Sequence, residues 1–330
     1  MKSILLLLLV LAAVGCKPVP SPNAAPLAAR TTKLEHALHD GESLLLANGV
    51  EHWVRIAAAA RATIPVVVIH GGPGGNNYAF EHTIGPELER YATVLYYEQR
   101  GCGRSKAPSD HDYAMSTLVA DLEALRERLG LERIHLLGYS FGGALALEYA
   151  IAHPDRVDHM ILQAPMFGHL ERTRALQIDA FDVVSKGEMH ERVRGILRAP
   201  GGDEEHIEQI WKVVDTKTVD ALLFHDPAKA APMRKLWAES HLGGPNQEMA
   251  QTYSKPQPGD PLLWRARGLD TRALVMVGLY DRNVGVDGPR ELSQALSRAD
   301  FVVFDASAHF PDLEEPDKYA DTVKAFLGKR

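Results

Sequence analysis

Cysteine is scarce in this sequence, and neither strong positive charge nor a long apolar run is present. The 330 residues include two cysteines, carry a formal net charge of −7 and contain no concentrated block of Lys and Arg. Proteins that bind nucleic acid normally carry a basic patch, so nucleic acid is not an expected partner. The apolar run at the amino terminus has eleven residues, which is too short for a membrane-spanning helix of about 20 residues.

That short apolar run, Ile4–Val14, follows Lys2 and is typical of the central region of a signal peptide. It ends in LAAVGC, which resembles the bacterial lipobox, with Ala13 where Leu is more usual. We therefore expect residues 1–16 to be a lipoprotein signal ending at the lipidated Cys16. The alternative is a plain secretory signal with an incidental cysteine. A lipid on Cys16 would anchor the exported protein to the cell envelope without a spanning helix.

The lipobox interpretation leads to two further expectations, one about the membrane and one about the second cysteine. Lys17 follows the cysteine, which favours the outer membrane, facing the periplasm, if the cell has two membranes. If Cys16 is lipidated, the second cysteine, Cys102, has no partner for a disulfide. Cys102 lies in the glycine-rich stretch RGCGRS, so we interpret it as a small turn residue, the alternative being a nucleophile.

After a Pro- and Ala-rich tether at residues 17–40, the pattern becomes that of a folded domain. Residues 42–49 and 52–60 predict two strands joined by a turn at Asn48-Gly49. The apolar stretches 65–70 and 92–101 predict two more strands. Strands and helices then alternate from residue 115 to 165 and again from 271 to 330, which predicts a mostly parallel sheet with helices on both faces.

Residues 166–263 interrupt this alternation. They contain charged, helix-favouring stretches such as DEEHIEQIWKVVD and no convincing strand. About a hundred residues are too many for a loop between two strands of a sheet. We therefore expect a core made of residues 41–165 and 264–330, with residues 166–263 forming a helical cap.

The stretch GYSFG, residues 138–142, fits the pattern G-x-S-x-G. It lies where the predicted strand RIHLLGY gives way to the predicted helix ALALEYA. In such a tight turn the glycines relieve crowding, and the hydroxyl of Ser140 is exposed at the carboxyl end of the sheet. We interpret Ser140 as a nucleophile; the alternative is a serine that caps the helix.

A serine nucleophile needs a base, and the base needs an acid that orients it. His309 follows the predicted strand FVVFDAS, and Asp281 follows the strand ALVMVGLY. Both residues thus lie at carboxyl ends of strands, where open α/β sheets place their sites. The order Ser140, Asp281, His309 is the one that this kind of hydrolase requires. Asp287 and Asp305 are the alternatives for the acid.

The negative oxygen formed by serine attack needs preorganised donors. One is the backbone N–H of Phe141, the residue after the nucleophile, and the other normally comes from the loop after the third strand. That loop reads HGGPGGN, residues 70–76. Glycine-rich backbone also cradles phosphates, but neither the sequence G-K-[ST] nor the pattern G-x-G-x-x-G accompanies it here.

Several stretches together resemble the proline iminopeptidase branch of the α/β-hydrolase superfamily, which includes the tricorn-interacting aminopeptidases. They are HGGPGGN, YYEQRGCGRS, DLEALR, GYSFGG and AHPDRV, followed by the late Asp and His. The resemblance covers about residues 65–165 and 270–328. It implies an α/β-hydrolase fold and the release of a residue, often proline, from the amino end of short peptides. It also implies that Gly72, or failing that Gly71, is the second oxyanion donor, and that Glu98 lies in a loop that braces the site.

The chain departs from this family in two places. The family often has Trp after the nucleophile, where this sequence has Phe141. Family members bind the free substrate amine with acidic cap residues, since a buried cation needs a paired charge. Glu208 and Glu239 are candidates for that role, although ordinary solvated helix residues would look the same.

The sequence therefore predicts a serine hydrolase, with an aminopeptidase as the first hypothesis and a carboxyl-ester hydrolase as the second. A binding protein built on an inactive hydrolase fold is a third, non-enzymatic class. The expected partners are a short peptide or small-molecule substrate and the membrane. The chemistry requires no metal or cofactor, and no metal-ligand spacing stands out. The sequence does not indicate an oligomeric state.

Overall fold

The computed structural model describes residues 38–167, 170–255 and 261–328. The predicted signal, the lipidated Cys16 and nearly all of the predicted tether lie outside these ranges. They remain predictions from the sequence. No helix in the described ranges is long and apolar enough to cross a membrane.

The domain begins with the predicted hairpin. Strand β1 (Gly41–Ala47) pairs antiparallel with β2 (Val50–Ala57). The two residues between them, Asn48 and Gly49, both have positive φ, as a tight two-residue hairpin turn requires. Strand β2 then pairs antiparallel with β4, so the hairpin extends one edge of the sheet.

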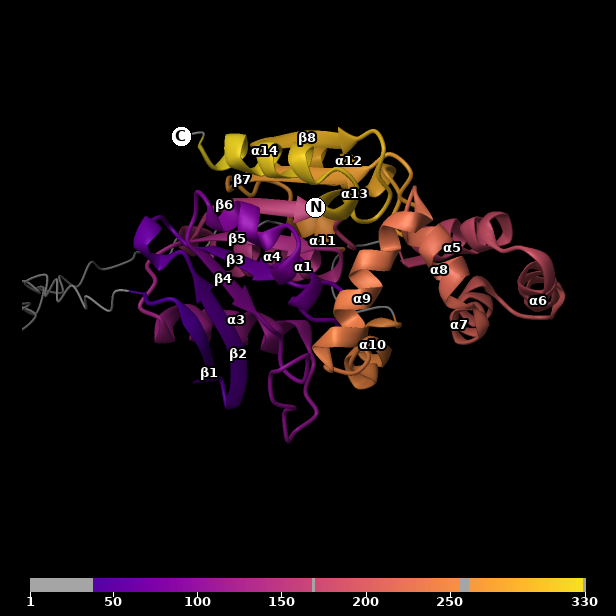
Figure 1. The fold of residues 1–330 in the computed structure, drawn as a ribbon, viewed down its shortest axis with the longest axis horizontal. Coiled ribbons are helices and arrows are strands. Elements are labelled where there is room, and N and C mark those ends of the chain that lie inside the picture. Colours follow the sequence, from indigo (N-terminus) through magenta and orange to yellow (C-terminus); the bar gives the residue numbers. More distant parts are fainter. Residues whose placement is uncertain (1–37, 168–169, 256–260, 329–330) are drawn as a thin grey trace, which may run out of the picture. The chain divides into compact units, whose positions relative to one another are not determined.

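The central sheet has eight strands in the order β1-β2-β4-β3-β5-β6-β7-β8 (Figure 1). From β4 onward every neighbouring pair is parallel, which confirms the predicted mostly parallel sheet. These strands are β3 (Val66–Ile69), β4 (Val94–Tyr97), β5 (Ile134–Tyr139), β6 (Val157–Gln163), β7 (Arg272–Gly278) and β8 (Ala299–Phe304). Strands β3 to β7 are almost wholly buried, as expected for strands covered on both faces.

Helices cover both faces of the sheet. One face packs against α3 (Met115–Arg128), α4 (Phe141–Ala152), α11 (Leu262–Arg265) and α12 (Asp287–Ala295). The other packs against α1 (Tyr78–His82), α2 (Gly85–Glu89) and α14 (Pro316–Leu327). The sequence analysis did not identify α1 and α2, since each has only five residues and too few turns to show a helical repeat.

Between β6 and β7 the described residues form helices and no strand. Before α11, these helices are α5 (Leu170–Val184), α6 (Gly187–Arg198), α7 (Asp203–Val213), α8 (Thr216–Leu223), α9 (Ala230–Ser240) and α10 (Gln247–Tyr253). Figure 1 shows α5–α8 grouped beside the sheet. This group has a small apolar core of its own, formed by Ala180, Phe181, Val193, Ile207, Ile210 and Leu222.

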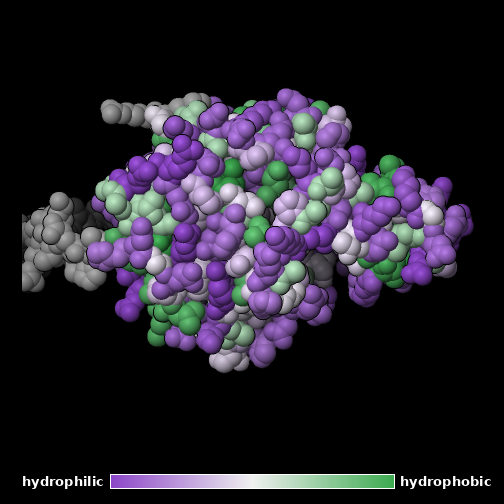
Figure 2. All heavy atoms as spheres, viewed as in Figure 1, coloured by the Kyte–Doolittle hydropathy of each residue, from purple (hydrophilic) through white to green (hydrophobic). Residues whose placement is uncertain are grey.

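The remaining elements are short. Helix α13 (Pro311–Glu314) follows β8, and single 3₁₀ turns occupy residues 59–61, 154–156 and 227–229. The face of the molecule shown in Figure 2 is mostly hydrophilic. Apolar side chains are exposed in β1, at Leu44 and Leu46, and among the cap helices, at Val183 and Trp211.

Candidate active site

Ser140 occupies the turn between β5 and α4 with φ 53° and ψ −121°. This positive φ is costly for a residue with a side chain and is held here by three backbone hydrogen bonds. The Ser140 N–H donates to the carbonyl of Gln163, while its own carbonyl accepts from the N–H groups of Gly143 and Met166. The neighbouring strand β6 and its following loop therefore hold the strained residue in place.

The two glycines that flank Ser140 are required by close backbone approach. A Cβ on Gly142 would collide with the carbonyl oxygen of Ile69 at the end of β3, and a Cβ on Gly138 would collide with the carbonyl oxygen of Gly142. The first turn of α4 thus packs directly on the sheet. The pattern G-x-S-x-G therefore has glycine at both positions because a side chain would not fit at either.

His309 and Asp281 meet as predicted. The imidazole Nδ1 of His309 lies 2.9 Å from Oδ2 of Asp281, and both residues are about 95% buried. The second carboxylate oxygen, Oδ1, accepts hydrogen bonds from the backbone N–H groups of Asn283 and Val284, at 2.8 and 2.9 Å. The carboxylate is therefore fixed on both sides and orients the imidazole ring.

The two alternative acids lie elsewhere. Asp287 is the first residue of α12, is 72% exposed and pairs with Arg172 at 3.5 Å. Asp305 is 81% exposed and pairs with Lys318 at 3.2 Å. Of the three aspartates, only Asp281 contacts the His309 ring.

The other ring nitrogen of His309 has a partner that the sequence analysis did not identify. Nδ2 of Asn283 lies 3.3 Å from Nε2 of His309 and donates to it. No hydrogen bond joins Ser140 to His309 among the described residues. Hydrogen bonds in a free active site are often loose and tighten only when substrate binds. We therefore expect Ser140 to form a hydrogen bond with His309 once the side chain of Asn283 moves away.

Asn283 is held from the cap. Its side-chain Oδ1 accepts from Nε2 of Gln177 in α5, at 2.9 Å. Gln177 in turn accepts at Oε1 from the indole N–H of Trp211 in α7, at 3.0 Å. A chain of three hydrogen bonds therefore runs from two cap helices to the ring nitrogen that would receive a proton from Ser140.

The glycine loop lies against the nucleophile. A Cβ on Gly71 would come within 2.9 Å of Cβ of Ser140, and Gly72 has φ +132°. Phe141 is the first residue of α4, where backbone N–H groups have no partner within the helix. Backbone N–H groups near a serine hydroxyl are what an oxyanion hole requires.

The loop after β4 braces the glycine loop. Nε2 of the fully buried His70 accepts from the backbone N–H of Gln99, so its Nδ1 is left to donate to the carbonyl of Gly71, at 2.9 Å. Burial lowers the pKa of His70, which keeps the ring neutral. Glu98 is also buried and binds the guanidinium of Arg104, at 2.7 Å, and the backbone N–H of Asn77. These contacts agree with the bracing role that the resemblance implies for Glu98.

Two acidic residues that the sequence analysis left without a role lie just after His309. Asp312 is buried and accepts from Nε2 of Gln163, and burial raises its pKa to about 6. Glu314 accepts from the backbone N–H groups of Ala308, beside the base, and of His225 and Asp226, in the cap. Glu314 thus ties the His309 loop to the segment after α8.

The two cap residues proposed to bind a substrate amine are solvated. Glu208 is 64% exposed and pairs with Lys212 at 2.6 Å, and Glu239 is 53% exposed and lies 3.7 Å from Lys235. Neither has a described contact with the Ser140 site, so this role remains a prediction.

Cys102 is buried, and burial raises the pKa of its thiol far above the usual range, which argues against a nucleophile.

A cavity of about 300 Å³ opens on the Asp281 side of the site. Its walls come from the loop after β6, from α5, from the loop after β7 and from the first residues of α12. The residues are Pro165, Met166, Phe167, Arg172, Thr173, Leu176, Leu279, Asp281, Val284, Gly285, Val286, Asp287, Gly288 and Pro289. The lining is mostly apolar, as is usual for a small-molecule site.

Several known hydrolases are similar to this chain in sequence. Proline iminopeptidase from Lactobacillus helveticus is 39% identical over 121 residues, which are 36% of this chain and 41% of that protein. The alignment thus spans about two fifths of that relative. The 2-hydroxy-6-oxo-2,4-heptadienoate hydrolase from Pseudomonas putida is 28% identical over 290 residues, which are 86% of this chain and 95% of that protein.

Solved structures show the same architecture. A proline iminopeptidase-related protein from Thermus thermophilus superposes with a TM-score of 0.72 at 23% identity, covering 88% of this chain and 98% of that one. The model of the family described as the alpha/beta hydrolase fold matches residues 64–316, which is most of the chain. The protein therefore belongs to the α/β-hydrolase fold family and is a hydrolase of that family.

Proposed function

We propose that the protein is a serine hydrolase that works through an acyl-enzyme on Ser140. The observation that carries the proposal is the buried pair formed by His309 and Asp281, 2.9 Å apart at the carboxyl end of the sheet that also presents Ser140. A buried imidazole oriented by a fixed carboxylate near a serine hydroxyl is suited to acyl transfer. The working residues on this proposal are Ser140, His309, Asp281, Gly72 and Phe141.

The Ser140 hydroxyl attacks a substrate carbonyl and forms a carbon–oxygen bond, while its proton passes to Nε2 of His309. Asp281 stabilises the imidazolium that forms. The backbone N–H groups of Gly72 and Phe141 hold the negative oxygen. As the leaving group departs, it takes the proton from His309. Water then attacks the acyl-enzyme by the same route, which frees the acid and restores Ser140.

For the substrate, we propose first a short peptide with a free amino end. This aminopeptidase activity is supported by the combination of HGGPGGN, the EQRG loop and GYSFGG, and by the relatives that are named proline iminopeptidase. The proline iminopeptidase from Saccharolobus solfataricus aligns over 301 residues but is only 25% identical.

A second candidate is a carboxyl-ester hydrolase on the same three residues. The observation that favours it is the state of Glu208 and Glu239, which are exposed and paired with lysines rather than turned to the site. An ester substrate needs no carboxylate to hold an ammonium group. A solved structure of similar fold is an esterase, from Exiguobacterium antarcticum.

A panel of aminoacyl-naphthylamides and p-nitrophenyl acyl esters separates the two candidates. We expect cleavage of Pro-naphthylamide and loss of that activity when the substrate amine is acetylated. Cleavage of simple acyl esters with no action on any free-amine naphthylamide would instead establish the esterase. Activity on neither series, in a protein that is folded, would contradict both.

We also propose that the protein is exported and anchored through a lipid on Cys16, because its apolar leader ends at that cysteine. Metabolic labelling with a tagged fatty acid in the native host tests this proposal. Label should enter the wild type and be absent from Cys16→Ser. Unlabelled wild-type protein released as a soluble form would contradict it.

A further inference from the structure

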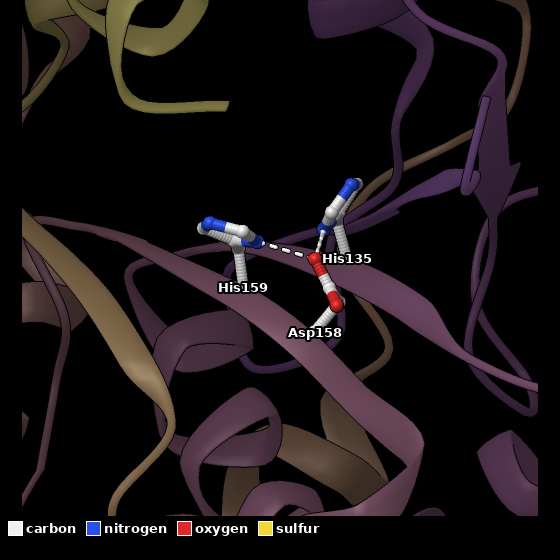
Figure 3. A group of neighbouring side chains, drawn as sticks. All are labelled: His135, Asp158 and His159. Atoms are coloured by element: carbon white, nitrogen blue, oxygen red, sulfur yellow. Dashed lines mark hydrogen bonds and ion pairs between the residues drawn. The ribbon is translucent and has the colours of Figure 1, made fainter. Parts of the chain in front are cut away.

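A second cluster of chemically capable side chains lies at the opposite end of the strand that carries Ser140. His135 is the second residue of β5, and Asp158 and His159 are the second and third residues of β6. Figure 3 shows the three side chains converging from these two strands. Ser140 follows the carboxyl end of β5, so this cluster is separate from the site described above.

An irregularity between the strands brings the three side chains together. Ile134 pairs with Val157 and Leu136 pairs with Met160, so one residue of β5 faces two residues of β6. Successive side chains of a regular strand point to opposite faces, but an extra residue of this kind redirects them. The bulge explains how the side chains of the consecutive residues Asp158 and His159 can both belong to the same cluster.

The contacts converge on one atom. Oδ2 of Asp158 lies 2.6 Å from Nδ1 of His159 and 3.6 Å from Nδ1 of His135. The other oxygen, Oδ1, is held by the guanidinium of Arg133, at 2.7 Å. Arg133 thus fixes the carboxylate so that its other oxygen, Oδ2, faces both imidazole rings. One ligand atom each from His135, Asp158 and His159 lies within 4.8 Å of the other two.

His135 supplies the second, independent observation. Its side chain is nine-tenths buried, and its Nδ1 has no hydrogen-bond partner although it faces the cluster. A buried polar atom without a partner is costly, so it needs an explanation.

We propose that His135, Asp158 and His159 form a binding site for a divalent transition metal, with Zn²⁺ as the ion that fits best. Two imidazoles and one carboxylate are a common ligand set for zinc, with a water as the fourth ligand. With metal–ligand bonds of about 2.0–2.1 Å, tetrahedral ligands lie about 3.3 Å apart. The His135–Asp158 separation of 3.6 Å is close to this value, and His159 needs to move outward by under 1 Å.

The position predicts what the ion would do. It would link β5 to β6 at their amino ends, and His159 also packs edge-on against Phe326 of the last helix, with ring centroids 5.2 Å apart. An ion that binds the folded chain stabilises it by mass action. The site should therefore raise the melting temperature of the protein without taking part in catalysis, since the catalytic groups lie at the other end of the sheet.

The test uses the purified full chain, stripped with a chelator and titrated with Zn²⁺ by calorimetry, with metal content measured after desalting. We expect one tightly bound Zn²⁺ per chain and a raised melting temperature. Asp158→Asn and His135→Leu should each weaken Zn²⁺ binding at least about tenfold. Even mutations of residues that only support the metal ligands lower metal affinity about 10–100-fold. His135→Leu fills the buried space with an apolar side chain that has no ligand atom. If one of the two variants fails to fold, the other still tests the proposal.

A matched control is His111→Ala, which removes an exposed His–carboxylate pair formed with Glu248, at 2.9 Å. It should bind Zn²⁺ as the wild type does. Replacing Zn²⁺ with Co²⁺ gives a further readout, because a tetrahedral site with nitrogen ligands produces visible absorption bands. A wild type that retains no Zn²⁺, or equal binding by the wild type and both cluster variants, would overturn the proposal.

Discussion

At the residue scale, the hydrogen bonds of Asp281 suit the orienting role that we propose for it. Its two oxygens accept three hydrogen bonds, one from His309 and two from the backbone N–H groups of Asn283 and Val284. The carboxylate is therefore fixed before any substrate arrives. Its charge remains available to stabilise the imidazolium that forms during proton transfer.

Asp281→Asn should reduce turnover of any substrate in the panel by about 10⁴-fold, the loss that the same change causes in well-studied triads. The backbone donors remain, so the fold should persist, which circular dichroism checks. Asp305→Asn is the matched control and should keep wild-type turnover, because Asp305 is exposed, pairs with Lys318 and does not line the cavity. Near-normal activity of Asp281→Asn would move the orienting role to another carboxylate.

The sequence was sufficient to predict Asp281 and His309, because both follow strands and their order along the chain is fixed by the fold. It was not sufficient for Asn283. Asparagine has no distinctive spacing, and its importance comes from a contact with Gln177, 106 positions away in the sequence. Asp312 was missed for a similar reason, since its raised pKa results from burial that only the folded structure shows.

At the scale of elements, the glycine loop between β3 and α1 has more than one reason for its bare backbone. Gly71 leaves room for Ser140, and a Cβ on Gly74 would come within 2.6 Å of the backbone of Asn246, just before α10. The carbonyl of Gly74 also accepts from the N–H of Asn246, at 2.8 Å. The sequence predicted an oxyanion loop, but it did not predict that the same loop is a contact for the cap.

The hydrogen-bond chain from α5 and α7 to His309, the proposed base, should slow the reaction of Ser140 to a measurable extent. Asn283→Ala frees Nε2 of His309 to accept from Ser140, so we expect the rate of fluorophosphonate labelling of Ser140 to rise about threefold to tenfold, the value of one neutral hydrogen bond. Gln177→Ala, which only loosens Asn283, should give a smaller rise. Gln209→Ala is the control, because Gln209 also lies in α7 but donates to Glu205 and not to Asn283. A fall in the labelling rate of Asn283→Ala would mean that Asn283 instead supports the active ring orientation.

The cap illustrates where prediction from the sequence stops. Length and composition predict its helices as a group, but charged amphipathic helices do not reveal which face meets the core. Acidic charge and a place in the cap make Glu208 and Glu239 candidates, and the structure places both in exposed pairs with lysines. Long-range contacts such as Glu314 with His225 decide the cap's position, and no local pattern encodes them.

On the scale of the whole molecule, the buried carboxyl of Asp312 makes stability depend on pH. Its pKa is raised from the ordinary 3.8 to about 6, so between these values the folded chain keeps a proton that the unfolded chain loses. The stabilisation is complete below pH about 4 and is lost as the pH rises through about 6. It amounts to on the order of 3 kcal/mol.

Urea unfolding of the wild type and Asp312→Asn across pH 3.5–7.5 measures this effect. The free energy of unfolding of the wild type should fall relative to the variant as the pH rises from about 4 to about 6, and the difference should then level off. Other titrating groups are common to both proteins and cancel. A difference that stays constant over this range would show that Asp312 is ionised throughout.

The parallel sheet also divides the molecule into two ends with different chemistry. Ser140, Asp281 and His309 follow the carboxyl ends of β5, β7 and β8, which agrees with the general placement of sites in open α/β sheets. The cluster of His135, Asp158 and His159 lies at the amino ends of β5 and β6. A bulge that no sequence pattern revealed creates it.

The proposed function depends most on Ser140 being an activated nucleophile. Intact-protein mass spectrometry after exposure to a fluorophosphonate tests this directly. We expect one adduct per wild-type chain, mapped to Ser140, and no adduct on Ser140→Ala that is folded to the same extent. An unlabelled wild type, or equal labelling of Ser140→Ala, would contradict it.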